Sequence, residues 1–252
     1  MKKQLHFMSG IPRSGSTVLA AILNQNKQTH VTITSGLIFA LEGLKNAWEN
    51  QELLYGDDTD SSRLNTSLAG VVDSYYKDCE QPIIIDKSRG WSFPETMQML
   101  AGITNNKPKI IATVRSIPDC MASFVRVAKP DSLDEFIEKD PLCEYLKRSY
   151  QVLEAGYSFA PECFCIIEYE DLLLDPQGQL KKIHEFLELD NYEYDFTAID
   201  GSSLKENDEK LHGYAGMHDI APVLAKQHNK DPRDVLKHHY NSFCQPEFWL
   251  ET

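Results

Sequence analysis

The chain has 252 residues, which is long enough to bury a large hydrophobic core without the support of disulfides or bound metals. Its composition, with 42% hydrophobic and 25% charged residues, is ordinary for a globular protein and argues against extensive disorder. A net charge of −13 argues against a non-specific binder of nucleic acids or anionic membranes, and no apolar run approaches the ~20 residues of a membrane span.

Five short apolar runs predict β-strands. In chain order they lie at residues 5–8, 31–34, 82–86, 110–114 and 164–168. Because these runs are apolar on both faces, they are typical of strands that lie between two layers of helices in a parallel sheet.

Apolar residues at helical spacing predict helices between these strands. The first helix follows the first strand at once and places Val18, Leu19, Ile22 and Leu23 on one face. Further helices are predicted at residues 36–50, 62–78, 92–103, 118–128, 133–138, 141–157 and 176–188. The alternation predicts an α/β fold of three layers, with a central parallel sheet of about five strands and functional groups at the carboxyl ends of the strands.

Two segments lack such periodicity. Residues 52–62 are predicted to form a polar loop, and residues 201–234 form a long irregular segment in which glycines and prolines lie among scattered charges. No segment of the sequence indicates a boundary between two domains. We therefore expect a single domain over residues 1–252, irregular from about residue 200.

The cysteines and the amino terminus indicate a cytoplasmic protein. The six cysteines form no C-x-x-C pair, which suggests reduced thiols rather than a disulfide framework or a zinc site. Pro12 and Arg13 interrupt the first apolar stretch before it could form the core of a secretory leader.

Charge is distributed unevenly. Residues 1–41 contain no Asp or Glu, and residues 107–130 carry five basic side chains and one acid, whereas residues 131–210 hold 7 basic and 21 acidic side chains. The two acid-poor segments either reflect chance beside a solvated acidic surface or meet around a strongly anionic ligand.

The turn after the first strand favours the anionic ligand. It contains Gly10, Arg13 and Gly15 and opens the first helix, whose unpaired N–H groups and dipole attract anions. The hydroxyls of Ser14, Ser16 and Thr17 and the guanidinium of Arg13 add donors. The alternative is an ordinary strand-to-helix turn capped by a serine.

A nucleotide-hydrolysing P-loop has the same glycine spacing but requires a lysine where this chain has Ser16. Without that lysine the charge of β- and γ-phosphates is poorly neutralised, so ATP or GTP chemistry is disfavoured. We therefore expect a P-loop-like fold whose turn binds an anion other than the β- and γ-phosphates of ATP or GTP.

This turn resembles the 5′-phosphosulfate loop of sulfotransferases, P-[KR]-[ST]-G-[ST]-[ST]. The matching residues are Pro12, Arg13, Ser14, Gly15, Ser16 and Thr17. The variant with arginine is most similar to the tyrosylprotein and carbohydrate sulfotransferases.

A second segment is similar to the 3′-phosphate site of the same family, in which an arginine ends a strand and a serine follows eight residues later. Here these residues are Arg115 and Ser123. A guanidinium at a strand end and a hydroxyl on the next helix can converge on one phosphate. Residues 167–172, with the sequence I-E-Y-E-D-L, resemble a structural segment of the family.

The resemblance implies transfer of a sulfuryl group from 3′-phosphoadenosine 5′-phosphosulfate (PAPS) to an acceptor hydroxyl or amine, which leaves adenosine 3′,5′-bisphosphate (PAP). It implies that Arg13 contacts the 5′-phosphate and the bridging oxygen and that Lys87, at the end of the third strand, stabilises the leaving group. It implies no metal, and the sequence shows no cluster of metal ligands. The acceptor is a small molecule, carbohydrate or peptide.

The sequence does not identify a single general base. Related tyrosylprotein enzymes have a glutamate after the second strand, where this chain has none. The candidates are Glu42, His30, Asp86, His212 and His218. Trp91 either stacks on adenine or packs in the protein.

Two other functions remain as alternatives to a sulfotransferase. One is a nucleotide-dependent kinase of similar architecture, which would need a Mg²⁺ site. The other is a non-catalytic nucleotide-binding module.

Overall fold

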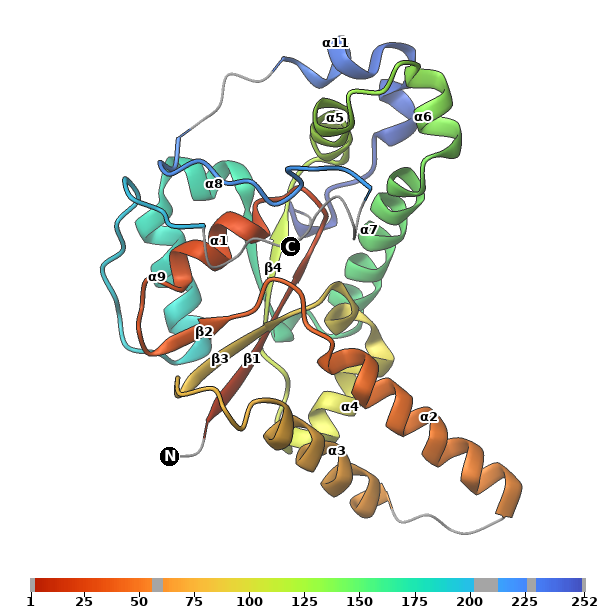
Figure 1. Ribbon diagram of the computed structural model, residues 1–252, viewed down its shortest axis with the longest axis vertical. Coiled ribbons are helices and arrows are strands. Elements are labelled where there is room, and N and C mark those ends of the chain that lie inside the picture. Colours follow the sequence, from red (N-terminus) through yellow and green to blue (C-terminus); the bar gives the residue numbers. More distant parts are fainter. Residues whose placement is uncertain (1–2, 56–60, 202–212, 226–229, 251–252) are drawn as a thin grey trace.

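The computed structural model describes residues 3–55, 61–201, 213–225 and 230–250. At its centre is a parallel sheet with the strand order β2-β3-β1-β4-β5 (Figure 1). The strands are β1 (Gln4–Gly10), β2 (Thr29–Val31), β3 (Ile83–Lys87), β4 (Ile110–Val114) and β5 (Phe164–Glu168). The predicted parallel α/β architecture is therefore confirmed.

The order of the strands fixes where a ligand can enter. From β1 the chain first builds β2 and β3 on one side and then β4 and β5 on the other. Connections therefore leave the carboxyl ends of β1 and β4 in opposite directions. In open α/β sheets the crevice at such a point is the usual ligand site.

Helices cover both faces of the sheet. They are α1 (Ser16–Leu23), α2 (Leu37–Tyr55), α3 (Ser61–Tyr75), α4 (Pro94–Thr104), α5 (Ile117–Ala128), α6 (Leu133–Lys139), α7 (Pro141–Phe159), α8 (Tyr169–Leu174), α9 (Pro176–Leu187) and α11 (Pro232–Leu236). Short 3₁₀ turns are η1 (Arg89–Ser92), η2 (Pro161–Cys163), η4 (Lys237–Phe243) and η5 (Phe248–Leu250). The predicted helices are all present, whereas α8, α11 and the 3₁₀ turns were not foreseen.

Alternate residues of each strand enter different cores. Phe7, Ile84 and Ile110 face a core that includes residues of α2, α4, α5 and α7. Their neighbours Met8 and Ile85 face a second core formed with α1, α8 and α9. This alternation is the physical reason why the strands read as continuous apolar runs. Figure 1 shows α1, α8 and α9 on one side of the sheet and α2, α3, α4 and α7 on the other.

Two boundaries differ from the prediction. The second strand was expected at residues 31–34, but β2 ends at Val31. Thr32 still bonds to β3, since its N–H donates to the Ile85 carbonyl at 3.1 Å and its hydroxyl accepts from Lys87 N–H at 2.8 Å. β2 ends opposite Ile85, while β3 continues to Lys87. In the predicted loop at 52–62, α2 continues to Tyr55, and residues 56–60 lie outside the described part.

None of the described helices is both long and apolar enough to cross a membrane. All six cysteines are free thiols, and Cys120, Cys143, Cys163 and Cys165 are buried.

His6 on β1 makes stability depend on pH. Burial, together with the charge of Lys109, lowers the pKa of His6 from 6.5 to about 4. The unfolded chain binds a proton at His6 below pH 6.5, but the folded chain does so only near pH 4. The free energy of unfolding should therefore fall by about 3 kcal/mol across this window. Urea unfolding from pH 7 to 4 measures this loss. A His6→Gln variant should lose much of the pH dependence, and an unchanged slope in that variant would contradict the assignment.

Candidate active site

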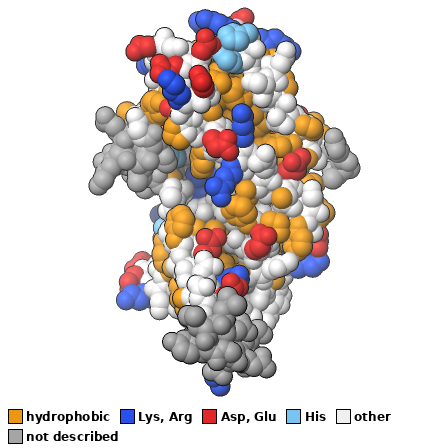
Figure 2. Space-filling view, turned by 90° about the vertical axis from the view of Figure 1, so that its right-hand side faces the viewer, with side chains coloured by type: hydrophobic (Ala, Val, Ile, Leu, Met, Phe, Trp, Pro, Cys, Tyr) orange, Lys and Arg blue, Asp and Glu red, His pale blue; other side chains and the backbone are white. Residues whose placement is uncertain are grey.

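A cavity of about 1430 Å³ lies at the carboxyl ends of the strands. Its wall includes the turn after β1, the segment after β3, the end of β4 and residues 213–225. Figure 2 shows Lys and Arg side chains gathered at mid-height of one face of the molecule, with hydrophobic side chains around them.

The turn after β1 has a backbone that only certain residues allow. Gly10, Arg13 and Gly15 all have positive φ, of 138°, 66° and 87°. A Cβ at Gly10 would lie 2.4 Å from the Thr113 carbonyl oxygen, and one at Gly15 would lie 2.5 Å from the Tyr169 ring. The two glycines therefore allow the loop to pack directly against β4 and α8.

The loop leaves the start of α1 open to the cavity. Gly15 is the N-cap of α1, no side chain caps the helix, and its first turn contains no acid. Gly15, Ser16, Thr17 and Val18 all line the cavity. The positive end of the helix dipole and its free N–H groups therefore face the cavity, an arrangement that suits a phosphate or sulfate.

Ser14 has a different role from the one expected. Its hydroxyl is buried and bonds within the protein, to the carbonyls of Ile11 at 2.6 Å and Thr113 at 2.9 Å. Ser14 does not line the cavity. Ser14 joins the loop to β4. The hydrogen-bond donors that this loop offers to the cavity come from the residues around Ser14.

We expect Gly15→Ala to lower the free energy of unfolding by about 1–3 kcal/mol, the usual cost of a non-glycine residue in strained backbone, with a further loss from the contact with Tyr169. Urea unfolding measures this change. Gly43→Ala in α2 is the matched control, because a Cβ there meets no atom within 4 Å and alanine favours a helix. Equal stability changes in both variants would contradict the role given to Gly15.

Arg13 and Ser123 meet across the cavity. The Nε of Arg13 donates to the Ser123 hydroxyl at 3.1 Å, and another guanidinium nitrogen donates to the Met217 carbonyl. Arg13 therefore joins the turn after β1 to α5 and to the late segment 213–225. The sequence had foreseen Arg13 and Ser123 as ligand-binding residues but not their bond to each other.

Arg115 lies at the end of β4 and lines the same cavity as Arg13. Its guanidinium is largely buried, bonds to Glu170 at 3.1 Å and Asp119 at 3.5 Å, and lies 4.4 Å from the centre of the Tyr169 ring. The two carboxylates and the Tyr169 ring hold the Arg115 guanidinium in one orientation. Arg115 and the start of α1 line the same cavity.

Arg126 is a cavity residue that the sequence reasoning did not single out. It lies three residues after Ser123, on the same face of α5. Burial lowers the pKa of Arg126, and the charge of Arg115 lowers it further. Two guanidiniums that repel each other in one cavity are stabilised by an anion between them. The helical spacing from Ser123 was the signal that could have identified it.

Lys87, the last residue of β3, is 4% exposed and lines the cavity. Its neighbour Asp86 points the other way. The Asp86 carboxylate is fully buried and accepts hydrogen bonds from Tyr76 and, at 2.9 Å, from the Trp91 indole. Burial raises the pKa of Asp86. Asp86 thus lies in the core and Lys87 lines the cavity, although the two are adjacent residues of β3.

The structure distinguishes the candidates for the general base by whether they line the cavity. Glu42 on α2 and His218 in the late segment line the cavity, whereas His30 and Asp86 do not. His30 lies on the short strand β2, beside the Tyr76 ring, and burial lowers its pKa. His212 lies outside the described residues. Trp91 packs on Phe7 in the core, which excludes it as an adenine-stacking residue in this conformation.

The charge of the cavity is opposite to that of the chain. The described lining contains the cations Arg13, Lys87, Arg89, Arg115, Arg126 and Arg148 and the carboxylates Glu42, Asp140 and Asp219. The acid-poor segments therefore meet around the cavity, as one of the two readings of the charge pattern predicted.

A group of possible metal ligands lies away from this cavity. Asp134, His238 and His239 are brought together between α6 and η4, although the sequence showed no such cluster. Both imidazoles face the Asp134 carboxylate, with Nε2 to Oδ1 distances of 3.3 and 2.6 Å. None of the three lines the cavity.

A sequence model described as "Sulfotransferase family" matches residues 6–194, while no curated protein matches the chain. The sulfotransferase domain of the Synechococcus PCC 7002 olefin synthase has a TM-score of 0.51 and 19% identity, over 98% of this chain and 90% of that one.

Two other solved structures are also similar. A sulfotransferase from Alicyclobacillus acidocaldarius has a TM-score of 0.49 and 16% identity, over 82% of this chain and 88% of that one. A mouse sulfotransferase complexed with PAP has a TM-score of 0.47 and 14% identity, over 100% and 82%.

The family match covers β1 to the segment after α9, and therefore includes the loop at Arg13 and the strand end at Arg115. The Synechococcus domain shares the fold. Together with the cationic cavity at the carboxyl ends of the strands, this match shows that the chain belongs to the sulfotransferase family.

Proposed function

We propose that this sulfotransferase takes its sulfuryl group from PAPS and transfers it to a hydroxyl or amine, releasing PAP. The observation that carries the proposal is the convergence of Arg13, Arg115 and the open start of α1 on one cavity. A nucleotide with charged groups at both its 5′ and 3′ positions matches two such anion sites.

The donor groups fit this nucleotide. The N–H groups of the first turn of α1, with Ser16, Thr17 and Arg13, suit the 5′-phosphosulfate. Arg115 and Ser123, supplemented by Arg126, suit the 3′-phosphate. The cavity exceeds the ~300–1,000 Å³ of common ligand pockets, so it has room for a nucleotide and an acceptor.

PAPS supplies a sulfuryl group activated by a phosphate leaving group. Lys87 and Arg13 stabilise the charge that grows on the leaving phosphate oxygen, and Glu42 accepts the proton of the acceptor. A bond forms between the acceptor atom and sulfur, and the bond from sulfur to the phosphate oxygen breaks. Glu42 is preferred over His30 because Glu42 lines the same cavity as Lys87, whereas His30 does not.

Calorimetry with PAP, ATP and GTP, each with and without Mg²⁺, tests the donor. Micromolar or tighter binding of PAP in the presence of EDTA is expected. Mg²⁺-dependent binding of ATP with no binding of PAP would instead support the kinase alternative. Binding of PAP without transfer from PAPS to any member of a broad acceptor panel would support a non-catalytic binding module.

A further inference from the structure

The cavity has a second cationic wall, built by segments other than α1 and the turn before it. It is formed by Arg89 of η1 and by Tyr145 and Arg148 of α7. The guanidinium carbon of Arg89 lies 5.5 Å from the centre of the Tyr145 ring. The Nε of Arg89 is buried and has no hydrogen-bond partner among the described residues. A buried guanidinium donor without an acceptor costs free energy unless a ligand satisfies it.

This wall is held rigidly. The Arg89 carbonyl accepts a hydrogen bond from the Ser9 hydroxyl at 3.1 Å, and Ser9 in turn accepts from the Ser92 hydroxyl at 2.6 Å. A Cβ at Gly156 would lie 2.1 Å from the Ser92 carbonyl oxygen, so α7 lies directly against η1. The positions of Arg89 and of the α7 side chains are therefore fixed relative to each other before a ligand binds.

Neither arginine of this wall forms an ion pair with a carboxylate among the described residues. Of the described acids within residues 131–210, Asp140 is the one that lines the cavity. Its carboxylate already caps α7 through Leu142 N–H and accepts from the Tyr214 hydroxyl. The acidic segment therefore does not provide a surface for a cationic acceptor inside the cavity.

Apolar side chains also line the cavity. Ile38, Phe39, Phe93 and Val152 come from α2, the segment after η1, and α7. Phe39 is 73% exposed, so its ring is accessible to a ligand in the cavity.

We propose that the acceptor combines an apolar body with an anionic group such as a carboxylate. Arg89 and Arg148 bind the anionic group, and Tyr145 and Phe39 contact the apolar body. Because Arg89 follows Lys87 by two residues, this places the acceptor beside the residue assigned to the leaving group. The inference deepens the proposed function and rests on it.

Matched probes test this acceptor class by calorimetry with the PAP-saturated protein. The probes are 4-hydroxyphenylacetate and 12-hydroxydodecanoate, each compared with its uncharged methyl ester. At least one acid is expected to bind about tenfold or more tightly than its ester, the scale of a charge-assisted hydrogen bond. In the double variant Arg89→Gln, Arg148→Gln this ratio should fall toward one.

Arg63→Gln is the control, because Arg63 is an exposed arginine of α3 that does not line the cavity, and this variant should keep the wild-type ratio. Equal affinity for acid and ester, absence of binding by both acids, or an unchanged ratio in the double variant would overturn the inference. The PAP titration comes first. If PAP does not bind, the proposed donor fails, and the comparison of acid and ester on the free protein still decides the acceptor class.

Discussion

Replacing Lys87 by alanine is expected to lower kcat by about 10²–10³-fold, the loss found when one preorganised electrostatic donor is removed from an active site. Lys87 is nearly buried at the end of β3, so its ammonium group acts where little water screens it. The charge is needed mainly when the sulfuryl group departs, because negative charge then grows on the phosphate oxygen. The affinity for PAP should therefore change much less than turnover.

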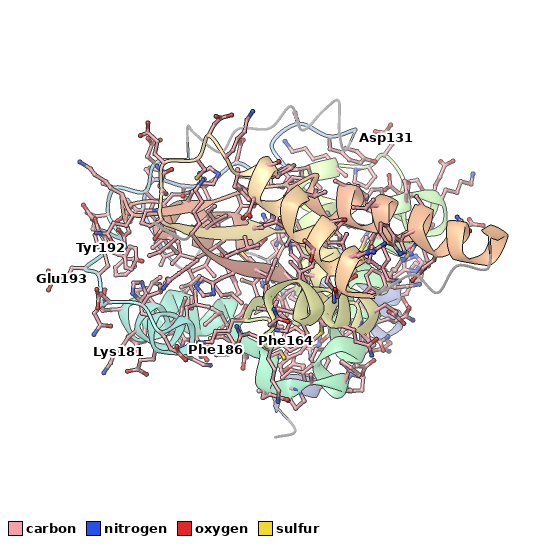
Figure 3. All side chains as sticks on the ribbon, turned by 90° about the horizontal axis from the view of Figure 1, so that it is seen from below. Asp131, Phe164, Lys181, Phe186, Tyr192 and Glu193 are labelled. Atoms are coloured by element: carbon pink, nitrogen blue, oxygen red, sulfur yellow. The ribbon has the colours of Figure 1, made fainter. Side chains whose placement is uncertain are left out.

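The measurement is the rate of labelled sulfate transfer from PAPS, together with calorimetric binding of PAP. Lys181→Ala is the matched control, since Lys181 lies on α9 at the edge of the molecule and is paired with Glu185 at 3.7 Å (Figure 3). Equal losses in turnover and in PAP affinity would make Lys87 a binding residue rather than a group that acts in the transition state.

Arg115→Ala should weaken PAP binding by ~1.5–3 kcal/mol, or about 10- to 150-fold in Kd. Glu170, Asp119 and the Tyr169 ring orient the Arg115 guanidinium, so its positive charge is presented to the cavity in one direction. The two carboxylates are partly exposed, and water can solvate them once the arginine is removed. The loss should therefore appear in binding more than in folding.

Removal of the 3′-phosphate distinguishes this role from a general electrostatic effect. Arg115→Ala should bind adenosine 5′-phosphate nearly as well as the wild type does, because that nucleotide lacks the group assigned to Arg115. Arg233→Ala on α11 is a suitable control, since Arg233 is exposed and pairs with Asp231. If Arg115→Ala leaves the affinity for PAP unchanged, the 3′-phosphate assignment is wrong.

The fold was largely predictable because its signals are local. Each strand lies between two helical layers, so both of its faces are apolar, and a short run such as residues 110–114 is sufficient to identify it. The exception is residues 31–34. β-branched residues favour an extended chain there, but β2 ends at Val31, opposite Ile85, although β3 continues to Lys87.

The sequence analysis also misplaced some residues of the site, because their positions depend on tertiary contacts. The hydroxyl of Ser14 was expected to face a phosphate, but it bonds to Thr113, which is 99 residues away in sequence. His30 carries suitable chemistry, yet the strand that bears it does not bring it to the cavity. Trp91 could equally have stacked on a base, and its hydrogen bond to Asp86 ties it to the core.

The sequence by itself determined the turn after β1, because positive φ at two glycines, an open helix start and an arginine are all encoded within residues 10–17. It also determined that Arg115 ends a buried strand. Only the tertiary structure decided that Met217 contacts Arg13 and that Arg89 meets Tyr145. These contacts join residues that are far apart in the sequence. Local periodicity carries no information about them, because they depend on the strand order and on how helices pack over the sheet.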